Sequence, residues 1–204
     1  MTDTIRLLLA DDQALVRGAL AALLNQESDL AVVAEVERGD EVLPAIAANE
    51  IDVALLDIEM PGLDGIDVVE QLTQRHANVR TLIVTTFGRP GYLRKALDAG
   101  ASGFVVKDTP ADELAYAVRR VHQGLRVIDP DLAAQSLIDG NNPLTNREQE
   151  ALRHTLDGTP VTTIASAMSL SVGTVRNYLS NAVAQTGAAS SSQAAVIARE
   201  RGWL

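Results

Sequence analysis

The 204-residue sequence contains no cysteine and very few aromatic residues, and both absences narrow the class of protein. Without cysteine there is no disulfide framework, thiol nucleophile or thiolate metal site, so nothing requires an oxidising compartment. Phe, Tyr and Trp make up only 3% of the chain although 47% of it is hydrophobic. The buried cores of this globular protein must therefore be built from Ala, Val, Leu and Ile.

Long apolar runs are missing as well. Residues Met1–Ala10 lack a basic segment followed by an apolar core. No later run approaches the roughly 18 apolar residues that a membrane helix needs. We therefore expect a cytoplasmic protein that has no membrane partner.

Basic residues are scarce, and the formal net charge of -10 is unevenly distributed. Residues 143–204 hold five arginines, four carboxylates and no lysine, which gives a net charge of +1, so residues 1–142 carry -11. An acidic surface repels duplex DNA, so only the C-terminal part is suited to bind it. Because domains commonly hold about 100 to 150 residues, the length and this asymmetry together predict two domains.

Five short apolar runs alternate with helical segments in the N-terminal part. Such runs suit strands that are buried on both faces, and the helices supply the crossovers between parallel strands. The pattern predicts a doubly wound α/β sandwich with a five-stranded parallel sheet. The expected strands are Ile5–Leu9, Leu30–Val36, Val53–Leu56, Thr81–Val84 and Gly103–Val106. The expected helices are Gln13–Gln26, Gly39–Asn49, Gly65–Arg75, Gly91–Ala99 and Pro110–Gln123.

Residues 125–142 predict a linker with a short helical stretch through Ile138, and only helices are expected after it. Thr145–Glu148 has the form of a capping box that opens a helix. The later helices are expected at Thr163–Met168, Val172–Thr186 and Ser191–Arg201. A tight turn at Ser169–Ser171 separates the first two of these helices, and Ser171 is a good N-cap for the second. This pattern predicts a helix-turn-helix.

Charged and hydroxyl side chains stand at the carboxyl ends of four predicted strands, where an open parallel sheet places its ligand site. These residues are Asp11, Asp12, Asp57, Thr85 and Lys107. Three carboxylates in one crevice repel one another unless a cation neutralises them, and a site of oxygen ligands with room for phosphate suits Mg²⁺. Asp12 and Asp57 are the expected direct ligands. The backbone carbonyl of Glu59 is a third, and Asp11 acts through water.

The same crevice suits phosphoryl transfer. Asp57 can attack a phosphoryl group as a carboxylate nucleophile and form an aspartyl phosphate. Mg²⁺ and the Lys107 ammonium would then share the charge of the phosphate oxygens. Thr85 would donate its hydroxyl to the phosphate, and Phe104 would rotate into the space that Thr85 vacates, so these two residues are the expected switch.

Four motifs together resemble the receiver domain of two-component response regulators, over about 120 residues. They are Asp11-Asp12, Leu55–Gly62, Thr85-Thr86 and Val106–Asp108. The resemblance implies a CheY-like (flavodoxin-like) receiver over residues 1–124, with a sensor histidine kinase as partner.

Taken singly, each of these residues has a simpler explanation. Asp12 could cap a helix, Asp57 could be a loop acid and Lys107 a solvated lysine. Thr85 could merely end a β-branched strand, and Phe104 could be a half-buried strand residue. The order and spacing of the whole set favour the functional interpretation. For Thr85 and Phe104 that interpretation depends on the resemblance to the family.

The C-terminal part resembles the NarL/FixJ, or LuxR-type, four-helix DNA-binding domain over residues 143–204. The matching segments are Pro143–Glu148, Ile164-Ala165 and Ser171–Arg176. The second helix of the motif would enter the major groove of double-stranded promoter DNA. Its candidate contacts with bases or phosphates are Thr174, Val175, Arg176, Asn177 and Tyr178, with Val175 placed for thymine methyl groups. Alternatively, this helix is only a core helix of a small bundle.

This domain departs from the family where basic residues would contact the DNA backbone, since Ser180, Gln185 and Ser191 stand there. Fewer phosphate contacts mean weaker binding by one domain, so phosphorylation-driven homodimerisation on adjacent half-sites should matter. Ala14–Val16 and Ala19–Leu24 make the first helix apolar nearly all round, which marks a candidate partner surface. The fifth-helix residues expected beside it are Leu114, Ala117, Val118 and Val121. An alanine-rich core helix explains the pattern equally well, and the fourth helix with the fifth strand is another candidate surface.

Arg89–Tyr92, Asp129-Pro130 and Arg201–Leu204 are similar to the membrane-lipid desaturase regulator (DesR-like) subgroup of that family. The resemblance implies that phosphorylation of Asp57 promotes dimerisation and DNA binding, with RNA polymerase as a further partner. The chain would catalyse its own phosphotransfer and dephosphorylation without being a turnover enzyme. Two rivals remain: a receiver whose helical appendage binds a protein, and a phosphatase in which Glu59 serves as general acid.

Overall fold

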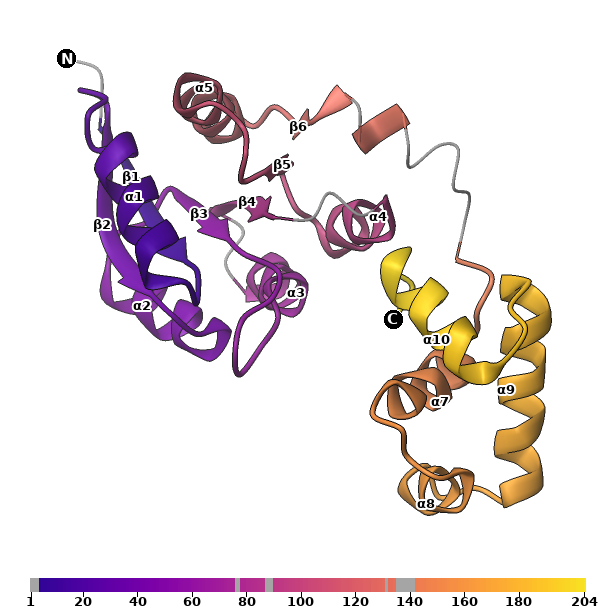
Figure 1. The fold of residues 1–204 in the computed structure, drawn as a ribbon. Coiled ribbons are helices and arrows are strands. Elements are labelled where there is room, and N and C mark those ends of the chain that lie inside the picture. Colours follow the sequence, from indigo (N-terminus) through magenta and orange to yellow (C-terminus); the bar gives the residue numbers. More distant parts are fainter. Residues whose placement is uncertain (1–3, 76–77, 87–89, 131, 135–141) are drawn as a thin grey trace. The chain divides into compact units, whose positions relative to one another are not determined.

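The protein forms an N-terminal and a C-terminal unit (Figure 1). The structure is a computed structural model, and it describes residues 4–75, 78–86, 90–130, 132–134 and 142–204. The helical stretch expected through Ile138 falls largely on residues 131 and 135–138, which lie outside the described residues, as does Arg89. No helix within the described residues is long and apolar enough to cross a membrane.

The N-terminal unit is built on a parallel sheet of six strands in the order β2-β1-β3-β4-β5-β6. The strands are β1 (Ile5–Ala10), β2 (Leu30–Val36), β3 (Val53–Leu56), β4 (Arg80–Thr85), β5 (Gly103–Val106) and β6 (Val127–Ile128). Strands β1 to β5 confirm the five expected runs to within one residue at each end. The strand number was wrong, because β6 lies in the segment expected to be a linker and pairs with β5 through Gly103↔Val127 and Phe104↔Ile128.

Helices cover both faces of this sheet (Figure 1). They are α1 (Ala14–Leu24), α2 (Val42–Ala48) after a 3-10 turn at Gly39–Glu41, α3 (Gly65–Arg75), α4 (Pro90–Ala99) and α5 (Ala111–His122). The core on the α1 and α5 side includes Leu24, Leu7, Leu55, Val105 and Val118. In α5 the acidic residues of the first turn and the basic residues of the last complement the helix dipole.

Residues expected on a dimer surface of α5 are instead part of this core. Their exposed fractions are 3% for Leu114, 3% for Ala117, 0% for Val118 and 0% for Val121. Their spacing places them on one helical stripe, and that stripe is covered by the sheet and α1 of the same chain. The prediction that these α5 residues contribute to a dimer surface is therefore wrong.

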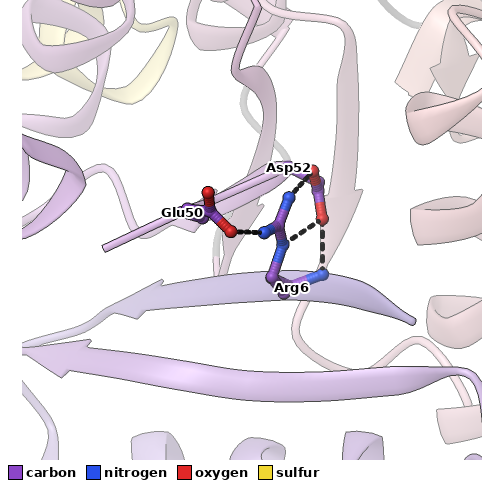
Figure 2. A network of polar contacts seen from close by, with 3 residues as sticks. All are labelled: Arg6, Glu50 and Asp52. Atoms are coloured by element: carbon purple, nitrogen blue, oxygen red, sulfur yellow. Dashed lines mark hydrogen bonds and ion pairs between the residues drawn. The ribbon is translucent and has the colours of Figure 1, made fainter. Parts of the chain in front are cut away.

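The amino-terminal ends of β1 and β3 are joined by a charged network around Arg6 (Figure 2). The Arg6 guanidinium donates to both carboxylate oxygens of Asp52, at 3.0 and 2.9 Å, and also pairs with Glu50. The backbone N–H of Arg6 donates to the same Asp52 carboxylate at 2.8 Å. The hydrogen bonds from Arg6 hold the pKa of Asp52 below its usual value. The pair thus fixes the ends of two neighbouring strands at the edge opposite Asp11.

We predict that this pair stabilises the unit in a pH-dependent way, tested with Asp52→Asn. A carboxyl group whose folded pKa is depressed stabilises the fold above its unfolded pKa, and this stability is lost as pH falls through the folded pKa. Wild type should therefore exceed Asp52→Asn in unfolding free energy at pH 7, and the difference should shrink below about pH 4. Urea unfolding from pH 7 to pH 3 measures it, with exposed Glu70→Gln as control. A difference independent of pH would contradict the prediction.

Within residues 142–204, the C-terminal unit forms four helices around its own core. They are α7 (Asn146–Leu156), α8 (Val161–Ala167), α9 (Val172–Thr186) and α10 (Ser191–Glu200). The expected capping box opens α7, since Glu148 N–H donates to Thr145 Oγ1 at 3.3 Å and Thr145 N–H donates to the Glu148 carboxylate at 2.8 Å. Trp203, the single tryptophan, is 5% exposed and packs in this core. Its fluorescence therefore reports on the C-terminal unit.

Candidate functional site

The carboxyl edge of the sheet gathers charged groups around Lys107. Asp11 directly follows β1, Asp57 follows β3 and Lys107 follows β5. The Lys107 ammonium lies 2.7 Å from the Asp11 carboxylate and 2.9 Å from the Asp57 carboxylate. These three side chains meet because a parallel sheet places all of its carboxyl ends at one edge.

Both carboxylates beside Lys107 are buried, with 3% of Asp11 and 5% of Asp57 exposed. Burial raises the pKa of Asp57, and the charge of Asp11 adds to this, outweighing the hydrogen bond from Lys107. Burial lowers the pKa of Lys107, but its hydrogen bonds to the two carboxylates outweigh this and leave the pKa raised. One ammonium therefore serves two buried acids, and the edge keeps an excess of negative charge.

Asp12 adds a third carboxylate to this edge. Asp11, Asp12 and Asp57 each offer an oxygen, and these oxygens lie within 4.8 Å of one another. Beside them lies a cavity of about 90 Å³. It is lined by Asp12, Gln13, Asp57, Glu59, Thr85 and Thr86. Clustered carboxylate oxygens next to an open space fit the ligand preference of a hard divalent cation such as Mg²⁺.

Thr85 and Phe104, the two expected switch residues, lie on neighbouring strands. Thr85 ends β4, is 4% exposed and lines the cavity. Phe104 on β5 is 0% exposed. The interpretation of Phe104 as a half-buried strand residue is therefore wrong. Phe104 does not lie on an edge strand, because β6 pairs with β5 at Phe104↔Ile128.

Two hydrogen bonds and the close approach of Gly65 fix the position of Asp57. Asp57 N–H donates to the Ala10 carbonyl at 2.9 Å, and Ile58 N–H donates to the Asp57 carboxylate at 2.7 Å. A Cβ on Gly65, the first residue of α3, would lie 2.0 Å from the Asp57 carbonyl oxygen. Only glycine fits this approach of helix to loop, a requirement that the sequence analysis missed.

Arg17 is a second cation at this edge that the sequence analysis did not identify. Its side chain on α1 is 16% exposed, and its Nε lies 3.7 Å from the Glu35 carboxylate. Its Nη1 donates to the backbone carbonyl of Asp11. Arg17 also lines a small cavity together with Asp11 and Asp57. The sequence offered a signal, because Arg17 is the only charged residue between Asp12 and Glu27.

The second helix of the expected helix-turn-helix, α9, presents only some of its candidate contacts. Arg176 and Asn177 are exposed, whereas Tyr178 is partly buried against the core. The Thr174 hydroxyl lies 2.8 Å from the hydroxyl of the N-cap residue Ser171. Val175 is 0% exposed and belongs to the core.

The expected contact of Val175 with thymine methyl groups is therefore wrong. Val175 shares the buried face of α9 with Leu179 and Ala182, which follow at helical spacing. A side chain on that face points into the domain and cannot reach a groove.

The two units match separate families of known proteins. Residues 7–119 match the response regulator receiver domain, and residues 142–198 match the luxR family of bacterial regulatory proteins. The uncharacterized transcriptional regulatory protein YvfU of Bacillus subtilis is 43% identical over 200 residues, covering 98% of this chain and 100% of that protein. The transcriptional regulatory protein DesR of the same organism is 38% identical, covering 98% and 99%. This similarity confirms the predicted resemblance to DesR.

A solved structure has the same two-part organisation. The crystal structure of the response regulator ChrA, from a heme-sensing two-component system, is 31% identical with a TM-score of 0.60. The match covers 98% of this chain and 99% of that one. With receiver chemistry gathered at the sheet edge and a helix-turn-helix in the second unit, the chain belongs to the two-component response regulators that join a receiver to a LuxR-type DNA-binding domain.

Proposed function

We propose that Asp57 accepts a phosphoryl group from a sensor histidine kinase and that this modification drives dimerisation and sequence-specific binding to promoter DNA. The observation that carries the proposal is the Lys107 ammonium held between Asp11 and Asp57 beside a third carboxylate. This excess of negative charge, next to an open cavity, requires a cation and leaves room for a phosphoryl group. Promoter-bound dimers would have RNA polymerase as their further partner.

Each residue at the edge has a role in phosphoryl transfer. Asp57 attacks the phosphorus atom, and a new O–P bond forms as the bond to the kinase histidine breaks. The Lys107 ammonium pairs with the oxygens of the transferred phosphoryl group, and the Thr85 hydroxyl donates a hydrogen bond to one of them. Phe104 then rotates into the space that Thr85 leaves. Mg²⁺, when held by Asp12, Asp57 and the Glu59 carbonyl with Asp11 acting through water, supplies charge neutralisation. The same groups align water for slow dephosphorylation, so the chain limits the lifetime of its own signal without turning over an external substrate.

We expect wild-type protein incubated with Mg²⁺ and acetyl phosphate to gain the mass of one phosphoryl group that is stable in acid and labile in base. Asp57→Ala should gain none, because no other carboxylate of the described residues shares the Lys107 ammonium with Asp11. Intact-mass spectrometry measures both, and exposed Glu70→Ala serves as the control that keeps the adduct. Failure of the wild type to be modified, with the cognate kinase also supplied, would refute the proposal.

Arg17 is proposed as a positioning residue for this reaction. Its bond to the Asp11 backbone carbonyl fixes the loop that carries Asp11 and Asp12, whose carboxylates lie together at the sheet edge. Replacing Arg17 would leave the carboxylates present but less well placed.

We therefore predict that Arg17→Met slows phosphorylation by acetyl phosphate about tenfold, since small misplacements of reacting groups are costly. The apparent Mg²⁺ affinity, measured by calorimetry, should fall as well, and Arg17→Lys should recover part of both. Exposed Arg75→Met is the control. An unchanged rate and affinity in a folded Arg17→Met protein would rule out the role.

Homodimerisation is proposed to use the outer face of α1. This face, here called the α1 stripe, comprises Leu15, Gly18, Ala19, Ala22 and Leu23. Leu15 is 87% exposed and Leu23 is 42% exposed, whereas a Cβ on Gly18 would meet nothing within 4 Å. An exposed leucine beside exposed small residues offers a surface that can pack against a second copy of itself, as a two-fold contact requires. Arg17 lies on the same helix, which joins the stripe to the Asp11 loop.

In Leu15→Asp protein, phosphorylation should proceed at the wild-type rate while the phosphorylated form stays monomeric, because a charge would be buried at the contact. Light scattering after chromatography measures the mass in solution. Leu125→Asp, at a leucine that is 43% exposed outside α1, is the matched control and should still dimerise. Dimerisation of phosphorylated Leu15→Asp would place the contact elsewhere, with α4 and β5 as the alternative.

A further inference from the structure

The solvent-facing side of α9 is a regular stripe with an unusual composition. We call it the outer stripe, and its exposed residues are Gly173, Arg176, Asn177, Ser180, Asn181, Ala184 and Gln185. They recur every three or four positions, opposite the buried residues Val175, Leu179 and Ala182. The outer stripe holds one charged residue, three side-chain amides and three small residues.

The low charge limits how much of the binding can come from phosphates. Residues 143–204 contain no lysine and five arginines, of which only Arg176 lies on α9. Phosphate contacts supply affinity without sequence information, whereas amides and guanidinium groups can read base edges. Neither Asn177 nor Asn181 has a hydrogen bond from its side chain to another described residue. Both amides are therefore available to a ligand.

Within the described residues, neither a close contact nor the backbone conformation requires glycine at position 173. A Cβ there would approach only the Ser171 hydroxyl, at an ordinary 3.7 Å, and Gly173 is not among the glycines with positive φ. Glycine destabilises a helix relative to alanine, so the missing side chain costs stability without an internal compensation. A close neighbour outside the protein, in front of the first turn of α9, would account for it.

We propose that the outer stripe reads adenine-containing DNA through Asn177 and Asn181, at a close approach that Gly173 permits. Asn forms paired hydrogen bonds with the N6 and N7 edge of adenine, and Arg176 is suited to guanine in the same way. Side chains one helical turn apart are separated by about 5–6 Å, which spans one or two base-pair steps of about 3.4 Å. Ser180 and Ala184 are too short to hold the helix away from the groove. This inference rests on the proposed DNA-binding function and names its sequence preference.

The test begins with in vitro selection from random duplex DNA by the full-length protein phosphorylated with acetyl phosphate. The site selected by the wild type should contain A·T pairs. Asn177→Ala should no longer select for A·T at one of these positions, and Asn181→Ala should no longer select for it at a neighbouring position. Affinity for the wild-type site should fall about 5- to 150-fold in each variant, the loss expected for one paired base contact. Exposed Val196→Ala on α10 is the control and should select and bind the wild-type site unchanged.

Gly173→Ala separates binding from folding, because the two readouts should move in opposite directions. Because alanine has a higher helix propensity than glycine, the substitution should raise the melting temperature reported by Trp203 fluorescence by about 1–4 °C. The same methyl should weaken binding to the selected site about tenfold or more. A more stable protein that binds less well cannot be explained by damage to the fold.

The outcomes distinguish this inference from the function on which it rests. If phosphorylated wild type selects no sequence at all, the proposed DNA-binding function fails, and the inference fails with it. If wild type selects a site that both asparagine variants also select, and Gly173→Ala binds it with wild-type affinity, the function stands and the inference is overturned.

Discussion

The Lys107 ammonium shared between Asp11 and Asp57 is the interaction on which the receiver depends. Two carboxylates that are almost completely buried have one cation between them, and Asp12 adds a third negative group. Such an arrangement is costly to fold, so the site is held in place by the sheet, whose parallel strands fix the positions of their carboxyl ends. The packing of the aliphatic core on either side of the sheet offsets the unfavourable free energy of burying these charges.

The same shortage of positive charge makes the site responsive. A phosphoryl group on Asp57 would draw Lys107 away from Asp11, and the Asp11 loop is tied through its carbonyl to Arg17 on α1. The α1 stripe lies on the opposite side of this short helix from Ala21 and Leu24, which pack in the core. A shift of the loop therefore acts on a rigid element that carries an exposed apolar surface, and a local change in charge can alter association between chains.

The sequence predicted most of the fold because buried parallel strands appear as continuous apolar runs, and α9 has the expected bounds. It missed β6, since two residues are too few to form a pattern. The error at Val175 was avoidable, because Val175, Leu179 and Ala182 follow the spacing of a buried face. The roles of Gly65 and Arg17 depend on contacts between distant segments, which spacing along one chain does not reveal. The residues that meet at the sheet edge could be found from the sequence because Asp11, Asp57 and Lys107 each directly follow a strand.

The sparse charge of the C-terminal unit connects its mode of binding to the control exerted by the receiver. Each phosphate that a protein neutralises contributes about 0.9 to the slope of log affinity against log salt, so a domain with few basic residues binds DNA weakly and non-specific sequences most weakly of all. With the proposed readout through neutral amides, a single α9 would gain little binding energy until a second copy occupied the adjacent half-site. Joining two domains then raises the effective concentration of the second by orders of magnitude. A weak monomer therefore improves regulation, because the difference in occupancy between unphosphorylated and phosphorylated protein grows as the affinity of the isolated domain falls.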